Sequence, residues 1–226
     1  LREMDFLRLP CYKVTMGVKI VFFDCDGTLT EVKSSWQYLH ERLGLWDENA
    51  DEYQRLFREG RIDYHEFCSR DAALWKGLPE SRILGIMEEI GYRQGVRQAM
   101  ATLRASGVVT VILSTGLAAL VDRAKRDLAM TYAKANELLV EGGVVTGGVR
   151  INVEHDKKGF WVRKILKSLR LRRHEAAAVG DGEGDLGMFE EVGLTIGCHP
   201  NEKIAGIVDH AFHNGSFVDI VDVLRP

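Results

Sequence analysis

The sequence predicts an α/β fold built on a doubly wound parallel sheet, with a small all-helical cap inserted after the first strand. Three observations predict it. Short apolar, β-rich runs end abruptly in acidic and glycine residues, helical patterns separate these runs, and one long early stretch is helical only. Strands that alternate with helices favour crossover connections and a parallel sheet that is buried on both faces.

Five apolar runs are the expected strands. They occupy residues 18–23, 108–113 and 176–179, with two shorter candidates at 194–196 and 207–208. Helical patterns at 95–105, 117–128 and 160–169 lie between them. This alternation predicts the core of the sheet and the helices that cover it.

Two segments depart from the alternation. Residues 34–91 contain no strand pattern and show about four amphipathic stretches, one opening at the capping-box sequence that starts with Asp63. We expect them to form a lid over the carboxyl edge of the sheet. Residues 138–153 alternate around Gly142-Gly143, which predicts a β-hairpin. The predicted domains are a core of residues 17–32 and 92–226, a cap of residues 33–91, and an N-terminal extension of residues 1–16.

Composition limits the class of protein. The formal net charge of −3 gives no reason to expect a nucleic-acid or anionic-membrane partner. The four cysteines are scattered without a C-x-x-C pair, which indicates reduced thiols and neither a disulfide framework nor a zinc site. No apolar run approaches the roughly 20 residues that a membrane span needs. We expect a cytoplasmic protein, with its oligomeric state open.

The first polar cluster is Asp-Cys-Asp-Gly-Thr at 24–28, directly after the first expected strand. Residues two apart on an extended strand point to the same side, so Asp24 and Asp26 can face one reaction centre. One can attack as a nucleophile while the other donates and accepts protons. Gly27 allows the backbone to turn sharply, so that both side chains can approach a ligand. The alternative is a pair of solvated aspartates in a turn.

The second cluster, Ser114-Thr115-Gly116, closes the strand expected at 108–113 and leads into a helical pattern. Ser114 and the amides around Thr115 and Gly116 are expected at a helix N-terminus, where free N–H groups and the helix dipole favour an anion. The alternative is that Ser114 is a plain N-cap.

The third cluster crowds Asp181, Glu183 and Asp185 into a glycine-rich turn after the strand expected at 176–179. Carboxylates so close together repel one another unless a cation lies among them. Oxygen ligands favour Mg²⁺ over zinc. A solvated acidic turn is the alternative.

The same loop also spells G-x-G-x-x-G through Gly182, Gly184 and Gly187, the fingerprint of a dinucleotide site, with Asp209 at a suitable distance beyond it. A pyrophosphate needs bare backbone amides, and the carboxylates of this loop would repel it. The extra strand expected at 194–196 also interrupts the required spacing. We therefore favour a metal site.

A phosphate group among these aspartates needs a positive partner, and the sequence His-Asp-Lys-Lys-Gly at 155–159 can supply it. A lysine at the start of a helix opposes the helix dipole, which suggests that it has a role elsewhere. The alternative for Lys157 and for Lys158 is a solvated surface residue.

In order and content, the four clusters resemble the motifs of the haloacid dehalogenase superfamily of phosphatases, in particular its phosphoserine phosphatase-like branch. The resemblance covers the chain from about residue 18 to the end and implies the Rossmann-like core of that superfamily. It implies that Asp24 is the nucleophile and Asp26 the general acid and base of a Mg²⁺-dependent phosphomonoester hydrolase with an aspartyl-phosphate intermediate.

The resemblance also implies the binding roles. Asp24, the carbonyl of Asp26, and Asp181 would bind Mg²⁺, with Asp185 supporting the metal shell. The phosphate-binding residues would be Ser114, Thr115, Gly116 and Lys158. Lys158 is chosen over Lys157 because the lysine of the family directly precedes a glycine.

Three departures from the family pattern bear on metal and substrate. Gly184 stands where the branch has an asparagine, so that contact near the metal is either missing or replaced by Glu183 or water. Lys33 stands where phosphoserine phosphatases place a glutamate for the amino group of the substrate. Their cap arginine falls on Ser69, with Arg70 beside it. This pattern predicts a substrate that carries a carboxylate or another anion, held through Arg70, and no amino group.

Other functions remain open at this stage. A phosphatase for a sugar or hydroxy-acid phosphate, or a phosphomutase on the same fold, would use the same motifs. True dehalogenases need no Mg²⁺ and lack the second aspartate, so Asp26 argues against that activity. A non-catalytic binding module should have lost at least one motif residue, and none is lost.

Overall fold

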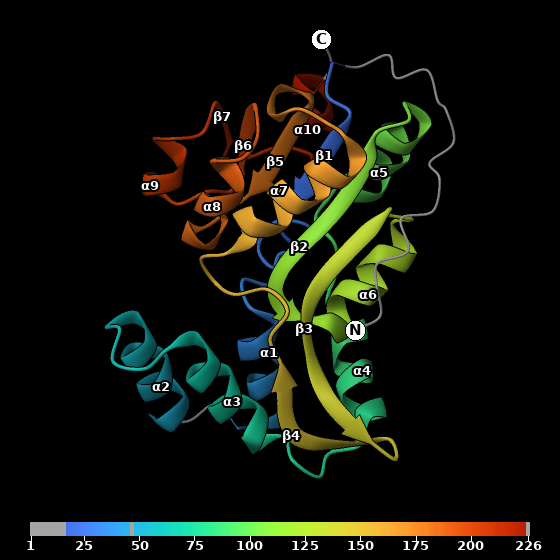
Figure 1. Cartoon of the computed structure of the whole chain (residues 1–226). Helices are drawn as coiled ribbons and strands as arrows, with labels where there is room; N and C mark the ends of the chain where they lie inside the picture. The colour runs from blue at the N-terminus through green and yellow to red at the C-terminus, as the bar shows by residue number, and fades with distance from the viewer. Residues whose placement is uncertain (1–16, 46–47, 225–226) are drawn as a thin grey trace.

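The computed structural model describes residues 17–45 and 48–224, and within them one sheet carries helices on both faces (Figure 1). Its seven strands follow the order β4-β3-β2-β1-β5-β6-β7. They are β1 Ile20–Phe23, β2 Val109–Leu117, β3 Tyr132–Glu141, β4 Val144–Arg150, β5 Ala176–Gly180, β6 Leu194–Cys198 and β7 His210–Phe212. All neighbouring strands are parallel except β3 and β4. The predicted α/β fold is confirmed.

Strand β1 lies at the centre of the sheet, and every residue in it is buried. Val21 and Phe23 join one apolar core, while Ile20 and Phe22 join the other. A strand buried on both faces needs a continuous apolar run and not an alternating one, which explains the sequence Ile-Val-Phe-Phe.

The order in which successive strands are added to the sheet reverses between β1 and β5. The chain proceeds outward from β1 through β2 to β3 on one side, and from β5 through β6 to β7 on the other. The carboxyl ends of β1 and β5 therefore meet at a topological switch point, where open parallel sheets bind their ligands.

Helices on the two faces of the sheet complete the two cores. On one face lie α5 Val96–Ala105, α6 Ala118–Asp127 and α10 Val218–Val223, and on the other α7 Lys158–Leu169, α8 Leu186–Phe189 and α9 Glu202–Ala205. Each of the three longer helices presents an apolar stripe to the sheet, such as Ala99 and Leu103 of α5.

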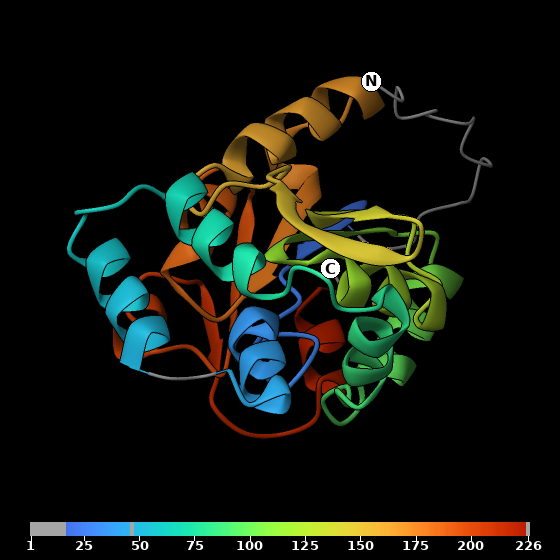
Figure 2. The same ribbon diagram turned by 90° about the horizontal axis from the view of Figure 1, so that it is seen from below.

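Four helices follow β1, as expected for residues 34–91. They are α1 Ser35–Leu43, α2 Glu48–Arg58, α3 Tyr64–Leu74 and α4 Glu80–Glu88. Asp63 caps α3 by accepting a hydrogen bond from the N–H of Glu66, as the sequence predicted. Figures 1 and 2 show α1, α2 and α3 gathered at the end of the molecule beyond β2. Helix α4 instead packs on α6, beside the core.

The β3–β4 hairpin is confirmed, and it turns at Gly142 and Gly143 as predicted. It reaches out to the cap, because the N–H of Gly77 donates to the carbonyl of Val145 at 2.9 Å and that of Val145 donates to the carbonyl of Leu78. Helix α3 packs directly against β4. The hairpin thus ties the cap helices to the sheet.

Two expectations need correction. Residues 207–208 form no strand, because the last strand lies further on at β7 and Ile207 is more than half exposed. Strand β2 also runs on through Ser114-Thr115-Gly116 to Leu117, four residues beyond its expected end.

The extension of residues 1–16 and Cys11 lie outside the described residues. Cys25, Cys68 and Cys198 are free thiols. No helix in the described ranges is long and apolar enough to cross a membrane.

Candidate active site

Asp24 and Asp26 follow β1 at the switch point, and both are more than 90% buried. The N–H of Asp24 donates to the carbonyl of Val179 at 3.0 Å, which fixes the start of the loop against β5. Gly27 has φ +78°, and a Cβ on it would lie 2.4 Å from Oδ2 of Asp181. Only glycine allows the two acidic loops to approach so closely.

Lys158 begins α7 and crosses to the acidic cluster. Its Nζ donates to Oδ1 of Asp24 and to Oδ1 of Asp185, both at 2.7 Å, and the side chain is 2% exposed. Burial alone lowers the pKa of Lys158, but Asp185 and Asp24 outweigh it and the net shift is upward. Lys157 instead pairs with Glu154 at the surface. The structure therefore brings Lys158, and not its neighbour, to the cluster.

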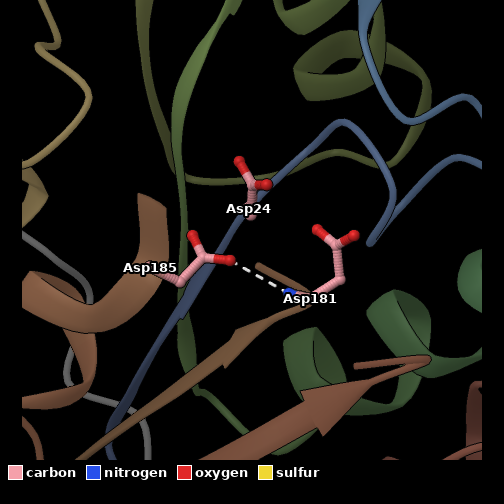
Figure 3. A group of neighbouring side chains, drawn as sticks. All are labelled: Asp24, Asp181 and Asp185. Carbon is pink, nitrogen blue, oxygen red and sulfur yellow. Dashed lines mark hydrogen bonds between the residues drawn. The ribbon is translucent and has the colours of Figure 1, made fainter. Parts of the chain in front are cut away.

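Asp181 and Asp185 come from the loop after β5, where residues 183–185 form a short 3₁₀ helix. Oδ2 of Asp185 accepts the N–H groups of Asp181 at 2.9 Å and Gly182 at 3.2 Å. Figure 3 shows Asp24 after β1, and Asp181 and Asp185 from the loop after β5, with the three carboxylates close together. One oxygen from each of the three lies within 4.8 Å of the others.

This donor set fits a hard divalent cation such as Mg²⁺, which prefers carboxylate oxygens. Burial raises the pKa of Asp181, and Asp185 raises it further, so the cluster carries an electrostatic cost that a cation would relieve. Both oxygens of Asp185 are already hydrogen-bonded, one to Lys158 and one to backbone amides. Asp185 is therefore suited to orienting Lys158 and the loop.

Burial raises the pKa of both aspartates of the first cluster, and their hydrogen-bond partners differ. Burial raises the pKa of Asp24 well above its usual range, and Lys158 opposes this while Asp185 and Asp181 add to it. Burial also raises the pKa of Asp26, although the N–H of Ser35 donates to its Oδ2 at 2.6 Å and lowers it. Oδ1 of Asp26 is buried without a hydrogen-bond partner among the described residues. A carboxyl group with a raised pKa and one uncommitted oxygen suits a general acid.

The segment Ser114-Thr115-Gly116 lies beside Asp26, though not at a helix N-terminus. Ser114 is fully buried, and its Oγ accepts the N–H of Gly116 at 3.0 Å. Helix α6 begins two residues after Gly116, with Leu117 as its N-cap, so the expected geometry of helix amides is wrong. A Cβ on Gly116 would lie 2.7 Å from Oδ2 of Asp26, so glycine is needed for this close approach.

A cavity of about 690 Å³ opens between these loops and the cap. Its floor includes Asp24, Asp26, Lys158, Asp181 and Asp185, and Thr115 and Gly116 line it as well. Ser114 is not among its lining residues. The motif residues and helices α1, α2 and α3 thus line one cavity.

The remaining predicted residues have different surroundings. Glu183 lines the rim of the cavity, but it pairs with Lys203 at 2.9 Å and is not one of the three clustered carboxylates. Arg70 does not line the cavity, because Glu66 one turn earlier pairs with its guanidinium and the ring of Tyr53 lies 4.9 Å below it. Lys33 does line the cavity, and its Nζ lies 2.7 Å from Oδ2 of Asp181. The expected carboxylate clamp through Arg70 is therefore not formed.

Several residues around the site were missed by the sequence reasoning. Asn136 of β3 is fully buried and donates to the carbonyl of Thr115 at 3.0 Å, and Tyr64 and Trp36 of the cap donate to the same oxygen. The N–H of Ser35 donates to Oδ2 of Asp26, and the Oγ of Ser35 accepts the N–H of Leu117. These residues fix the second cluster from outside the motifs. An asparagine in a half-buried strand was the one signal in the sequence.

Comparison with known proteins assigns the chain to a family. Residues 21–190 match the family described as haloacid dehalogenase-like hydrolase. The chain belongs to this family. A phosphoserine phosphatase from Halobacterium salinarum is 31% identical over 84% of this chain and 90% of its own length. One from Archaeoglobus fulgidus is 27% identical over 98% of this chain, which spans 64% of that protein.

Solved structures agree with the assignment. A phosphoserine phosphatase with an analogue of the phospho-aspartyl intermediate superposes with a TM-score of 0.80, at 25% identity, over 92% of this chain and 99% of its own. The expected resemblance to phosphoserine phosphatases is confirmed. The family and the relatives of the chain together indicate that it is a phosphatase.

Proposed function

We propose that this hydrolase is a Mg²⁺-dependent phosphomonoesterase that forms an aspartyl phosphate on Asp24, using a small phosphorylated metabolite as substrate. The observation that carries the proposal is the position of Asp24. Its carboxylate lies at the switch point of the sheet and at the floor of the capped cavity, directly against the buried ammonium of Lys158.

Lys158 orients the nucleophile. It holds Oδ1 of Asp24, so Oδ2 is the oxygen that attacks phosphorus. The bond from phosphorus to the alcohol oxygen breaks as the new bond to Oδ2 forms. The attack brings two anions together, so the positive charge of Lys158 lowers the barrier by offsetting their repulsion.

Asp26 acts first as the general acid and then as the general base. Its Oδ1 is buried without a hydrogen-bond partner among the described residues, so in the protonated carboxyl this oxygen can carry the proton that passes to the leaving alcohol oxygen. The resulting carboxylate then takes a proton from the water that attacks the phosphorus of the aspartyl phosphate, releasing inorganic phosphate. Asp24 regains its carboxylate, and Asp26 regains its proton.

The phosphate oxygens would be bound by Lys158 and by the backbone around Thr115 and Gly116, which line the cavity. Ser114 would support this backbone from behind, because its Oγ accepts the N–H of Gly116 and it does not line the cavity. Asp24, Asp181 and the carbonyl of Asp26 would hold Mg²⁺, with Asp185 behind them. Bound Mg²⁺ supplies positive charge that screens the phosphate and stabilises the anionic form of Asp24.

The relatives support the proposal. The two named above are phosphoserine phosphatases, and the solved structure named above holds a phospho-aspartyl intermediate analogue of such an enzyme. A cytoplasmic location and the absence of nucleic-acid and membrane partners stay predictions.

Release of phosphate from p-nitrophenyl phosphate tests the proposed function. We expect Mg²⁺-dependent release by the wild type and loss of at least about a thousandfold in Asp24→Asn, because the amide cannot form the acyl phosphate. Asp122→Asn, an exposed aspartate on α6, is the matched control and should retain wild-type activity. Substantial turnover by folded Asp24→Asn would contradict the assignment.

A further inference from the structure

The roof of the cavity has an aromatic wall. Phe57 and Phe67 stack with centroids 5.1 Å apart and planes 8° apart, and both line the cavity. His155 meets Phe57 edge-on at 5.5 Å, and Tyr64 lies 5.8 Å from the same ring. Helices α2 and α3 therefore present ring faces and edges to whatever part of a substrate extends away from the phosphate.

A buried carboxylate lies in the same roof. Asp71 of α3 is 3% exposed and lines the cavity, and it follows Phe67 by one helical turn. Its Oδ1 lies 3.4 Å from Nε2 of His40, which is itself fully buried. Among the described residues that helices α1, α2 and α3 contribute to the lining, Asp71 is the only acidic or basic side chain.

The positive groups of the cavity are committed to its floor. Lys158 is bound to Asp24 and Asp185, and Lys33 is paired with Asp181. No arginine is found among the lining residues in the part of the chain that the structure describes. A carboxylate on the leaving group would therefore meet Asp71 with no guanidinium to offset the repulsion.

We propose that Asp71 and the aromatic wall bind an ammonium group on the leaving alcohol, so that the substrates are phosphate esters of amino alcohols without a carboxylate. The proposal rests on the proposed phosphatase function. Aromatic faces and a desolvated carboxylate together attract a cation, whether a primary or a quaternary ammonium. This reverses the expectation from the sequence, which placed an anion in the cap through Arg70.

The position of the two sites explains why one molecule would satisfy both. The phosphate dianion meets Lys158 and the metal-binding loop at the floor, and the ammonium meets Asp71 at the roof. A zwitterionic ester places each charge against its opposite. A neutral ester gives the buried carboxylate of Asp71 no positive charge beyond its contact with His40, and an anionic ester adds repulsion.

Isosteric substrates test the proposal on the wild-type enzyme. Phosphoethanolamine is compared with propyl phosphate, and phosphocholine with 3,3-dimethylbutyl phosphate, because each pair differs in charge but little in shape. We expect kcat/KM to favour at least one ammonium member about tenfold or more over its neutral isostere, since hydrogen bonds and cation–π contacts to desolvated charges are worth that much. Phosphoglycolate, which carries a carboxylate, and phosphoserine should both be poorer substrates than the ammonium ester.

Variants of the roof connect the preference to these residues. Asp71→Asn should lower the ratio of kcat/KM between ammonium and neutral esters about tenfold, and Phe57→Leu should lower it severalfold. The control Asp51→Asn removes one negative charge from an exposed position of α2 outside the cavity and should leave the ratio unchanged. Thermal melting verifies that each variant is folded, and Phe57→Leu carries the test if Asp71→Asn does not fold.

The outcomes separate this inference from the proposed function. Wild-type enzyme that hydrolyses p-nitrophenyl phosphate but shows no preference for either ammonium ester, or prefers phosphoglycolate or phosphoserine, would overturn the role of Asp71. An unchanged ratio in folded Asp71→Asn and Phe57→Leu would do the same. Absence of Mg²⁺-dependent phosphatase activity on every ester would instead contradict the proposed function.

Discussion

The ammonium of Lys33 lies 2.7 Å from Oδ2 of Asp181, so a lysine at the base of the cap supplies positive charge to one of the proposed metal ligands. The lysine side chain is 62% exposed, whereas the aspartate side chain is 12% exposed. Lys33 and a divalent cation would compete for the same carboxylate oxygen. Lys33, which the sequence analysis placed near the substrate, is therefore also expected to affect the affinity of the site for the metal.

We predict that Lys33→Met binds Mg²⁺ more tightly than the wild type. The increase should be about two- to fivefold, because the exposed ammonium is screened by solvent and its ion pair contributes only roughly 0.2–1 kcal/mol. Titration calorimetry with Mg²⁺ alone, without substrate, measures the affinity. Lys167→Met on α7 is the matched control, and equal or weaker binding by Lys33→Met would refute the competition.

Removal of Lys158 should destabilise the fold as well as abolish activity. Lys158→Met leaves Asp24 and Asp185 buried together without their shared cation, and breaking a buried pair of this kind costs roughly 3–5 kcal/mol. Urea unfolding in the presence of a chelator measures the change. The neighbouring Lys157→Met removes a surface lysine and should change the unfolding free energy by less than about 0.5 kcal/mol. Equal losses of unfolding free energy in the two variants would contradict the role of Lys158 as the shared cation of Asp24 and Asp185.

Gly184 and His155 form a second coupled pair. A Cβ on Gly184 would lie 3.3 Å from Cε1 and 3.5 Å from Nδ1 of His155, so the imidazole lies against the space that a side chain at this position would enter. The family asparagine expected here would therefore crowd the histidine.

We predict that Gly184→Asn lowers the unfolding free energy by about 1–2 kcal/mol through overpacking. The double variant Gly184→Asn with His155→Ala should recover most of that loss, and His155→Ala alone is the control. A double-mutant cycle of urea unfolding measures the coupling. Strictly additive effects would show that the two residues do not compete for space.

Glu175 gives a prediction for pH. Hydrogen bonds from Lys19 and Arg172 lower the pKa of Glu175 to about 2, and the contact with Lys19 ties the start of β1 to β5. Because the folded pKa lies below the ordinary value of about 4.3, the stabilisation is complete above that value and is lost as pH falls from about 4.3 to about 2.

We therefore expect Glu175→Gln to lower Tm at pH 7 by about 1–4 °C, given that both partners are solvent-exposed, and by progressively less at acidic pH. Thermal melts at several pH values measure the difference from the wild type. The control Glu190→Gln removes the same charge at an exposed position. A loss of Tm in Glu175→Gln that grows towards acidic pH would contradict the lowered pKa of Glu175.

The sequence was most informative at the ends of β1 and β5, because there the chemistry is local. An apolar run followed by Asp24, Asp26 and Gly27 places both acids at a strand end, and the glycine-rich turn after β5 places Asp181 nearby. The pairing of Lys158 with Asp24 crosses 134 positions of sequence and was not predicted. The sequence placed a positive partner for the phosphate within residues 155–159, and the resemblance selected Lys158. The structure brings these residues together.

The cap could not be assigned in the same way, because successive residues on a helix point about 100° apart. Arg70 is directed to Glu66, one turn earlier, whereas Asp71 lines the cavity. An ungapped comparison cannot decide between such neighbours. The buried stripe Cys68, Ala72 and Trp75 could have drawn attention to Asp71, a charged residue beside it.

Trapping the covalent intermediate tests the central claim most directly. The enzyme is mixed with excess p-nitrophenyl phosphate and Mg²⁺, quenched in acid within its first turnovers, digested, and analysed by mass spectrometry. We predict one phosphorylated peptide, with the phosphate on Asp24, and none in Asp24→Asn. Turnover with phosphate on another residue, or with no phosphorylated peptide at any quench time, would contradict the role of Asp24 as the nucleophile.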